Sequence, residues 1–159
     1  MATYQSVSSE DRIDTGPYLD RAKASLRAAV ALRTASLFGD AATRAHQACV
    51  HAERALLATE KRSPQDLRGV HRMATLHFLQ TGQVPREHLA AVERLAILRA
   101  RADEVPLGEV TASDAGEAME LAAAFVAAAE EWIAANGFAG GAAAPAVPPA
   151  AAGPAGAPR

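Results

Sequence analysis

Apolar residues recur every three or four positions over most of this chain, and this spacing is the feature that most limits its fold. Between about residues 17 and 135 the apolar positions follow the periodicity of an α-helix, and no stretch alternates as a half-buried β-strand does. Half of the 159 residues are hydrophobic but only 4% are aromatic, so the core must be built from Leu, Ala and Val. The sequence therefore predicts an all-α fold, an up-and-down antiparallel bundle of about five helices.

Turn residues divide the periodic region into helices. The first helix is predicted to run from about residue 17 to Gly39, with Asp40 capping a second helix that continues to about residue 61. The first helix is indicated by residues at spacings of three and four, namely Leu19, Ala22, Leu26, Val30, Arg33 and Leu37. Because only two residues separate these helices, we expect them to be antiparallel neighbours.

Two capping-box patterns mark later helices. Ser63 and Asp66 of "SPQD" are predicted to open a third helix, which ends at "TGQVP". Thr111 and Asp114 are predicted to open a fifth helix, which ends at Asn136 before a glycine. A fourth helix is predicted between them, over about residues 86 to 103.

Both ends of the chain differ in composition from the periodic region. Residues 1–15 are polar and lack periodicity, and 20 of the 23 residues at 137–159 are Gly, Ala or Pro. The prolines of this tail lack a backbone donor and restrict the residues before them, so the tail should not be helical. We expect disordered segments at 1–15 and 137–159 around one bundle domain at 16–136.

Composition argues against several classes of protein. The longest apolar run, "LAAAFVAAA" at 121–129, is much shorter than the ~20 residues needed to cross a bilayer, and the N-terminus lacks a signal-peptide pattern. We therefore expect a cytoplasmic protein with no membrane partner. Cys49 is the only cysteine, which excludes an intrachain disulfide and a multi-cysteine metal site. Because no other ligand motif or glycine-rich phosphate loop occurs, we expect no metal and no cofactor.

Charge is distributed unevenly along the chain. Residues 20–101 hold fourteen Lys and Arg against seven Asp and Glu, whereas residues 102–158 hold eight acidic residues and no basic ones. A basic region can attract phosphates or an acidic partner. The alternative is that the acidic C-terminal helix lies on the basic helices and neutralises them.

The second predicted helix has apolar residues on two sides. Its core face is formed by small residues, namely Ala45, Ala48, Cys49, Ala52, Ala55 and Leu56. Val50 and Leu57 form a second strip on the other side, flanked by His46 and Glu53. This second strip should face either another helix of the bundle or another subunit.

Two Arg and His pairs offer candidate catalytic groups. Arg44 and His51 share one stripe of the second helix, two turns or about 10 Å apart, and across a dimer they could bind a phosphodiester, with His51 as general acid or base. The alternative is that both are exposed boundary residues. Arg72 and His77 of the third helix point ~140° apart on a regular helix, so their convergence requires a break or a second chain.

Arg99 lies on an apolar stripe of the fourth predicted helix, and Asp103 follows four residues later. A partly buried guanidinium needs a partner, which favours an inward-facing Arg99–Asp103 pair. The alternative is a surface pair that contributes only a few tenths of a kcal/mol.

Five segments of the chain, taken in order, carry a resemblance to a known family. They are "YLDRAKASLRAAVAL", "GDAATRAHQACVHAERALL", "RGVHRMATLHFLQTGQVP", "LAILRARAD" and "VTASDAGEAMELAAAFVAAAEEWI", and they cover about residues 17 to 134. Their order and spacing resemble the HEPN-domain proteins of bacteria and archaea. "HAERALL" at 51–57 is similar to the family's pattern, whereas the tyrosine pair that usually precedes it is replaced by His46 and Gln47.

The resemblance implies a helical bundle that usually forms a homodimer, is often encoded beside a minimal nucleotidyltransferase, and often acts on RNA in toxin–antitoxin or defence systems. Members that cut RNA have an Arg, typically followed by a polar residue, and a His with four to six residues between the two. Six residues separate Arg44 from His51 and four separate Arg72 from His77, but an apolar residue follows each arginine. On the later helix, where the family's motif generally lies, no histidine follows Arg99.

These departures favour a HEPN-type protein that binds a nucleotide, an RNA or a protein partner, in a module with a nucleotidyltransferase. Its binding residues are predicted to be Arg99, Asp103, Arg54 and Arg101. The first alternative is a metal-independent ribonuclease toxin that uses Arg44 and His51, or Arg72 and His77, across a dimer. The second alternative is a structural helical adaptor without enzymatic activity.

Overall fold

A computed structural model describes residues 14–104 and 108–138 of the chain. These ranges contain the helices α1 (Gly16–Thr34), α2 (Phe38–Thr59), α3 (Leu67–Ala74), α4 (Glu87–Asp103) and α5 (Ala112–Ala135), and a π-helical turn η2 (Thr75–Leu79) that continues α3. No strand occurs in the part described. The predicted all-α bundle is confirmed, whereas the predicted disordered segments lie almost wholly outside the described residues.

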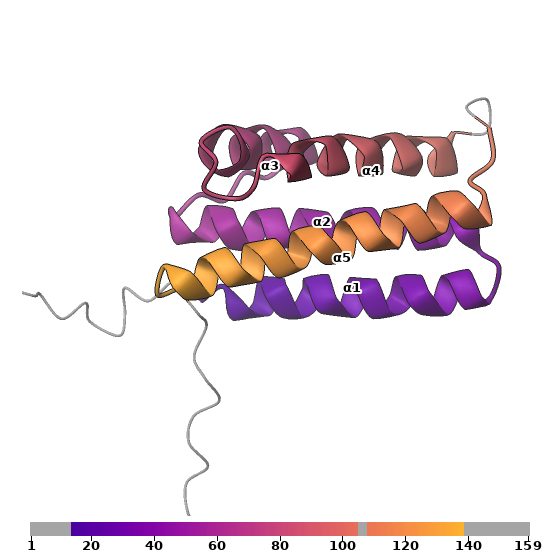
Figure 1. Ribbon diagram of the computed structural model, residues 1–159, viewed down its shortest axis with the longest axis horizontal. Helices are drawn as coiled ribbons and strands as arrows, with labels where there is room; N and C mark the ends of the chain where they lie inside the picture. Colours follow the sequence, from indigo (N-terminus) through magenta and orange to yellow (C-terminus); the bar gives the residue numbers. More distant parts are fainter. Residues whose placement is uncertain (1–13, 105–107, 139–159) are drawn as a thin grey trace, which may run out of the picture.

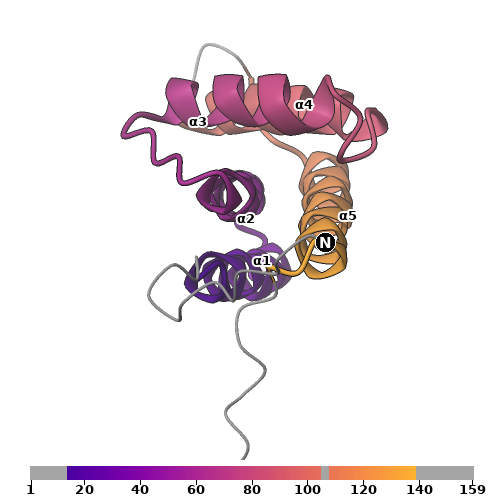
Figure 2. The same cartoon turned by 90° about the vertical axis from the view of Figure 1, so that its left-hand side faces the viewer.

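The other helices are arranged around α2. Figures 1 and 2 show α1 along one side of α2, α5 along another, and α3 and α4 as a layer over a third side. Small buried residues let α1 and α5 approach α2 closely. On the side of α2 that α3 and α4 cover, Val50 lies across a groove from Leu67 of α3 and Arg99 of α4. At Val50, the second apolar strip therefore faces helices of the same chain.

α1 packs on α2 through its smaller side chains. The buried residues of α1 are Leu19, Ala22, Ser25 and Ala29. Val30 and Leu37, which belong to the three-and-four spacing of the first predicted helix, are half exposed. Periodicity alone does not show which of these side chains are buried, because it does not show how closely two helices approach. The small residues of α1 fit against the small face of α2, and this turns Val30 outward.

α1, α2 and α5 end in the same backbone motif. Ser36, Lys61 and Gly137 follow these helices with positive φ values of 61°, 56° and 78°. After each of them, the next amide donates to a carbonyl five residues back, which completes a Schellman motif. The predicted end of the fifth helix is confirmed. Ser36 gave no comparable signal, because residues other than Gly rarely adopt this conformation.

Gly39 and Asp40 lie inside α2 rather than before it. The prediction that Gly39 ends the first helix and that Asp40 caps the second was therefore wrong. A Cβ added at Gly39 would lie 3.4 Å from the Cβ of Ala102, which is about van der Waals contact. Gly39 therefore lies where α2 faces α4, and not in a turn.

α3 begins later than predicted. Its N-cap is Asp66, whose carboxylate accepts a hydrogen bond from the amide of Gly69. The guanidinium of Arg54 on α2 donates to the carbonyl oxygen of Pro64 at 3.1 Å, which holds the preceding loop against α2. The predicted capping box that starts at Ser63 was wrong because Pro64 stays outside the helix.

α5 brings acidic residues against the basic helices. Thr111 and Asp114 form the predicted capping box at its N-terminus. Arg94 of α4 lies 3.3 Å from Asp114 and 2.9 Å from Glu117, and α5 also forms an ion pair with α1 through Glu130. These pairs confirm the interpretation that the acidic C-terminal helix lies on the basic part of the bundle.

Aromatic contacts and one hydrogen bond attach the ends of the described fold to the bundle. Phe78 of η2 meets Trp132 of α5 edge-on, with ring centroids 5.1 Å apart, and Trp132 stacks on Phe138. The hydroxyl of Thr15 donates to the carbonyl of Phe138 at 3.0 Å. Thr15 and Phe138, which were assigned to the terminal segments, are therefore in contact with the bundle.

Among the described helices, none combines the length and apolar character that a membrane span requires.

Leu98 and Ile97 are neighbours on α4 that should contribute very differently to stability. Leu98 is fully buried, whereas Ile97 is 54% exposed. We expect Leu98→Ala to lower the free energy of unfolding by about 2–5 kcal/mol and Ile97→Ala to lower it by less than about 1 kcal/mol. Urea denaturation followed by circular dichroism measures both. Equal losses would show that α4 presents a different face to the core.

Candidate functional site

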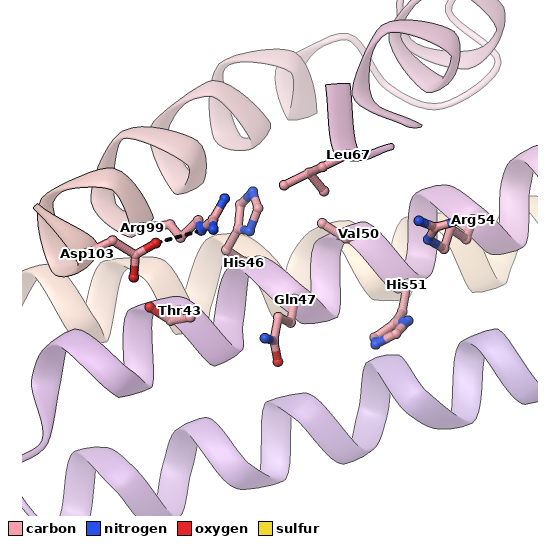
Figure 3. A pocket seen from close by; sticks show the side chains of 9 residues that line it. All are labelled: Thr43, His46, Gln47, Val50, His51, Arg54, Leu67, Arg99 and Asp103. Carbon is pink, nitrogen blue, oxygen red and sulfur yellow. Dashed lines mark ion pairs between the residues drawn. The ribbon is translucent and has the colours of Figure 1, made fainter. Parts of the chain in front are cut away.

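A groove between α2, the start of α3 and the C-terminal half of α4 is the candidate functional site (Figure 3). Its volume is about 440 Å³. Six of its lining residues share one face of α2, with spacings of three and four: Thr43, His46, Gln47, Val50, His51 and Arg54. Leu67, Arg99 and Asp103 complete it, and we call it the α2–α4 groove. An adjoining cavity of about 220 Å³ shares His46, Leu67, Arg99 and Asp103.

Three polar side chains form a hydrogen-bonded chain behind this groove. Nδ1 of His71 lies 2.9 Å from Oε1 and 2.6 Å from Oε2 of Glu53. Nε2 of His71 lies 3.2 Å from Nε2 of His46. Glu53 is fully buried and His46 nearly so, which makes these partners necessary. We call the three residues the Glu–His–His chain.

Burial changes the protonation of this chain. The pKa of His46 is lowered to about 4. Burial is the main cause, and charge repulsion from His71 and Arg99 adds to it. Burial also raises the pKa of Glu53, an effect that the hydrogen bond with His71 opposes. At neutral pH His46 is therefore a neutral imidazole, able to donate through one nitrogen and to accept through the other.

Arg99 provides a positive charge at the mouth of the groove. Its Nε lies 3.0 Å from Oδ2 of Asp103, and both side chains are between two fifths and half exposed (41% and 47%). The predicted pair is thus formed at the groove's edge rather than in the core. In Figure 3 the guanidinium of Arg99 lies beside the ring of His46. The ion pair engages Nε, so the terminal nitrogens of Arg99 can still donate to a ligand.

The two other arginines predicted for binding have different positions. Arg54 lines the groove while its guanidinium holds the carbonyl of Pro64. Arg101 instead donates to the carbonyl of Glu109 at 2.7 Å and lies 3.5 Å from Asp114. Arg101 therefore ties α4 to α5 and is not among the residues that line the groove.

The structure of a single chain does not bring Arg44 and His51 together. Arg44 is exposed and donates to Gln47 at 3.0 Å. His51 lies on the groove wall, and in Figure 3 its ring turns toward α1. Its pKa is lowered by burial and then by the charges of Arg21 and Arg54. Nδ1 of His51 is buried without a hydrogen-bond partner among the described residues.

Arg72 and His77 lie away from the groove. The π-helical turn η2 does provide a break between them, as their convergence would require. However, Nδ1 of His77 lies 3.0 Å from Oε2 of Glu60, and Arg72 is exposed on α3. His77 therefore contacts the C-terminal end of α2 rather than a shared ligand site.

His46, His71 and Glu53 were not predicted as a unit. The sequence did contain a signal, because His46 and Glu53 flank the strip of Val50 and Leu57 on a helix that is apolar on two sides. Polar residues in such a position must find partners when the helix is buried. His71 could not be assigned as that partner, because its position depends on how α3 crosses α2.

Comparison with protein families identifies the relatives of this chain. The HEPN domain matches residues 17–132, which include every residue of the α2–α4 groove. The chain belongs to the HEPN family. At the family level it is therefore a helical domain of a nucleotide- or RNA-related class. No curated protein matches the sequence.

His46 should make this HEPN domain less stable in acid. Its pKa is about 4 in the folded protein against a usual value of 6.5, so the unfolded chain binds more protons between these values. The stability that His46 contributes is complete above pH 6.5 and is lost as the pH falls to about 4. The pKa difference corresponds to a loss on the order of 3 kcal/mol.

Urea denaturation between pH 7 and pH 4 measures this effect. The free energy of unfolding of the wild-type protein should fall relative to that of His46→Gln by the amount given above. His77→Gln, the same substitution outside the groove, should keep the wild-type dependence on pH. Parallel pH profiles for wild type and His46→Gln would contradict the assignment.

Proposed function

We propose that this HEPN domain binds a phosphate-bearing ligand, a nucleotide or an RNA segment, in the α2–α4 groove. The supporting observation is the lining of the groove, which combines the guanidinium groups of Arg99 and Arg54 with the apolar side chains of Val50 and Leu67. Guanidinium groups bind phosphate oxygens, and apolar walls can cover a base. The volume of about 440 Å³ is within the range of small-ligand sites.

We also propose that the domain acts as a homodimer and as the partner of a nucleotidyltransferase, in a toxin–antitoxin or defence module. Membership of the HEPN family supports this proposal. Light scattering tests the dimer, because a mass of one 16.5 kDa chain at micromolar concentration would contradict it. Copurification with the product of an adjacent nucleotidyltransferase gene tests the module.

Arg99→Gln should weaken the binding of 5′-AMP and of a short oligoadenylate by about tenfold or more, because a charge-assisted contact to phosphate is lost. Arg94→Gln is the matched control, since Arg94 lies on the same helix and pairs with Asp114 and Glu117 outside the groove. Its affinity should equal that of the wild type. Isothermal titration calorimetry at one fixed salt concentration measures both variants.

Unchanged affinity in Arg99→Gln would place the ligand elsewhere, and absence of binding to both probes would favour the structural adaptor. The same oligoadenylate tests the metal-independent ribonuclease. Cleavage in the presence of EDTA that is abolished by His51→Ala or His77→Ala would favour that enzyme over a binding protein.

A further inference from the structure

The Glu–His–His chain links the α2–α4 groove to a buried carboxylate, and none of the sites predicted from the sequence includes it. Nε2 of His46 is engaged by His71, so Nδ1 is the nitrogen of His46 that a ligand in the groove can contact. His46 and Arg99 line both adjoining cavities. A ligand bound to Arg99 would therefore contact a histidine whose ring hydrogen is positioned by His71 and Glu53.

With Glu53 ionised and both histidines neutral, the hydrogens have one consistent arrangement. The Glu53 carboxylate accepts a hydrogen bond from Nδ1–H of His71. Nε2 of His71 then has a lone pair and accepts from Nε2–H of His46. Nδ1 of His46 is left as a bare acceptor, which repels the oxygens of a phosphate group.

Uptake of one proton reverses this arrangement. The proton binds to Nδ1 of His46, and the hydrogen on Nε2 of His46 moves to Nε2 of His71. His46 stays neutral and now presents an N–H donor beside Arg99. The added positive charge then has two possible positions. If the Nδ1 hydrogen stays on His71, an imidazolium of His71 lies beside the Glu53 carboxylate. If that hydrogen moves to Glu53, both His71 and Glu53 are neutral.

We propose that the Glu–His–His chain is a proton-controlled switch, which determines whether His46 accepts or donates a hydrogen bond in the groove and so makes a phosphodiester bind at Arg99 together with one proton. The ligand part of this proposal rests on the proposed function. The switch can be tested in the protein without ligand. The switch and the proposed ligand binding can therefore be contradicted separately.

The charges around the chain favour moving the proton to His71. A cation on His46 itself is opposed by burial and by Arg99, which is why the pKa of that ring is low. His71 is 22% exposed and lies directly beside Glu53, so a positive charge there is both solvated and paired.

Other ionisable groups face the chain from three helices. Arg54 of α2 acts on Glu53, and Arg68 of α3 lines the smaller cavity. The C-terminal end of α4, with its C-cap, contributes Arg99, Asp103 and Glu104. Among the described residues, no charged group of α1, α5 or η2 lines either cavity. The two acidic groups of α4 favour the protonated state, and the three arginines oppose it.

Nitrogen-15 NMR of the histidine rings tests the switch without any ligand. We expect the hydrogen of His46 to move from Nε2 to Nδ1 as the pH falls, with one midpoint for the coupled Glu–His–His chain. Glu53→Gln keeps the side-chain volume but removes the charge, so it should lower this midpoint by about one pH unit or more. His77→Gln should leave the midpoint unchanged. A single tautomer of His46 at every pH between 5 and 9 would overturn the switch.

Calorimetry with the dinucleoside monophosphate ApA tests the coupling to binding, because the charge of its diester does not change in this pH range. In buffers of different ionisation enthalpy, the wild type should take up about one proton per ApA above the NMR midpoint. Its affinity should fall by up to about tenfold per pH unit there. His71→Gln, checked for native helix content, should bind ApA without proton uptake.

The outcomes separate the two proposals. A tautomer switch without ApA binding at any pH supports the switch and overturns the proposed function. ApA binding without proton uptake, together with a fixed tautomer of His46, overturns the switch and keeps the proposed function.

Discussion

The burial of α2 is the constraint on which the rest of the structure depends. α1, α5 and the layer of α3 and α4 surround this helix, and its small side chains allow that close packing. A helix in this position must also bury the polar residues that its sequence contains. His46 and Glu53 are such residues, and an unpaired carboxylate in the core would be strongly unfavourable. The placement of His71 by α3 gives each of them a hydrogen-bond partner.

Charge in the molecule is divided between two sides of the bundle. On one side, α5 places Asp114, Glu117 and Glu130 against basic residues of α1 and α4. These pairs are partly exposed and contribute little stability individually, but they bring opposite charges together on that face. On the other side, Arg54 and Arg99 line a groove with a single carboxylate, Asp103. Two arginines of the basic region therefore lie where a ligand could contact them.

Helices were predictable where local chemistry decides the structure. The capping box of Thr111 and Asp114 and the stop after Asn136 depend on neighbouring residues, and both are confirmed. The exposed position of Val30 and the role of Gly39 depend on how closely two helices approach, which periodicity does not report. The Glu–His–His chain was missed for a related reason, since its members come from two helices whose crossing is decided by packing.

Arg99 shows why a spacing pattern along one helix is insufficient to identify a site of this kind. The resemblance to HEPN proteins directed attention to a histidine after Arg99 on the same helix, and none is present. The fold instead places His46 of α2 beside Arg99 (Figure 3). Their proximity depends on how closely α2 and α4 approach, and Gly39 lies near Ala102 where these helices face each other. A site of this kind therefore depends on the packing of two helices, which a pattern along one helix does not report.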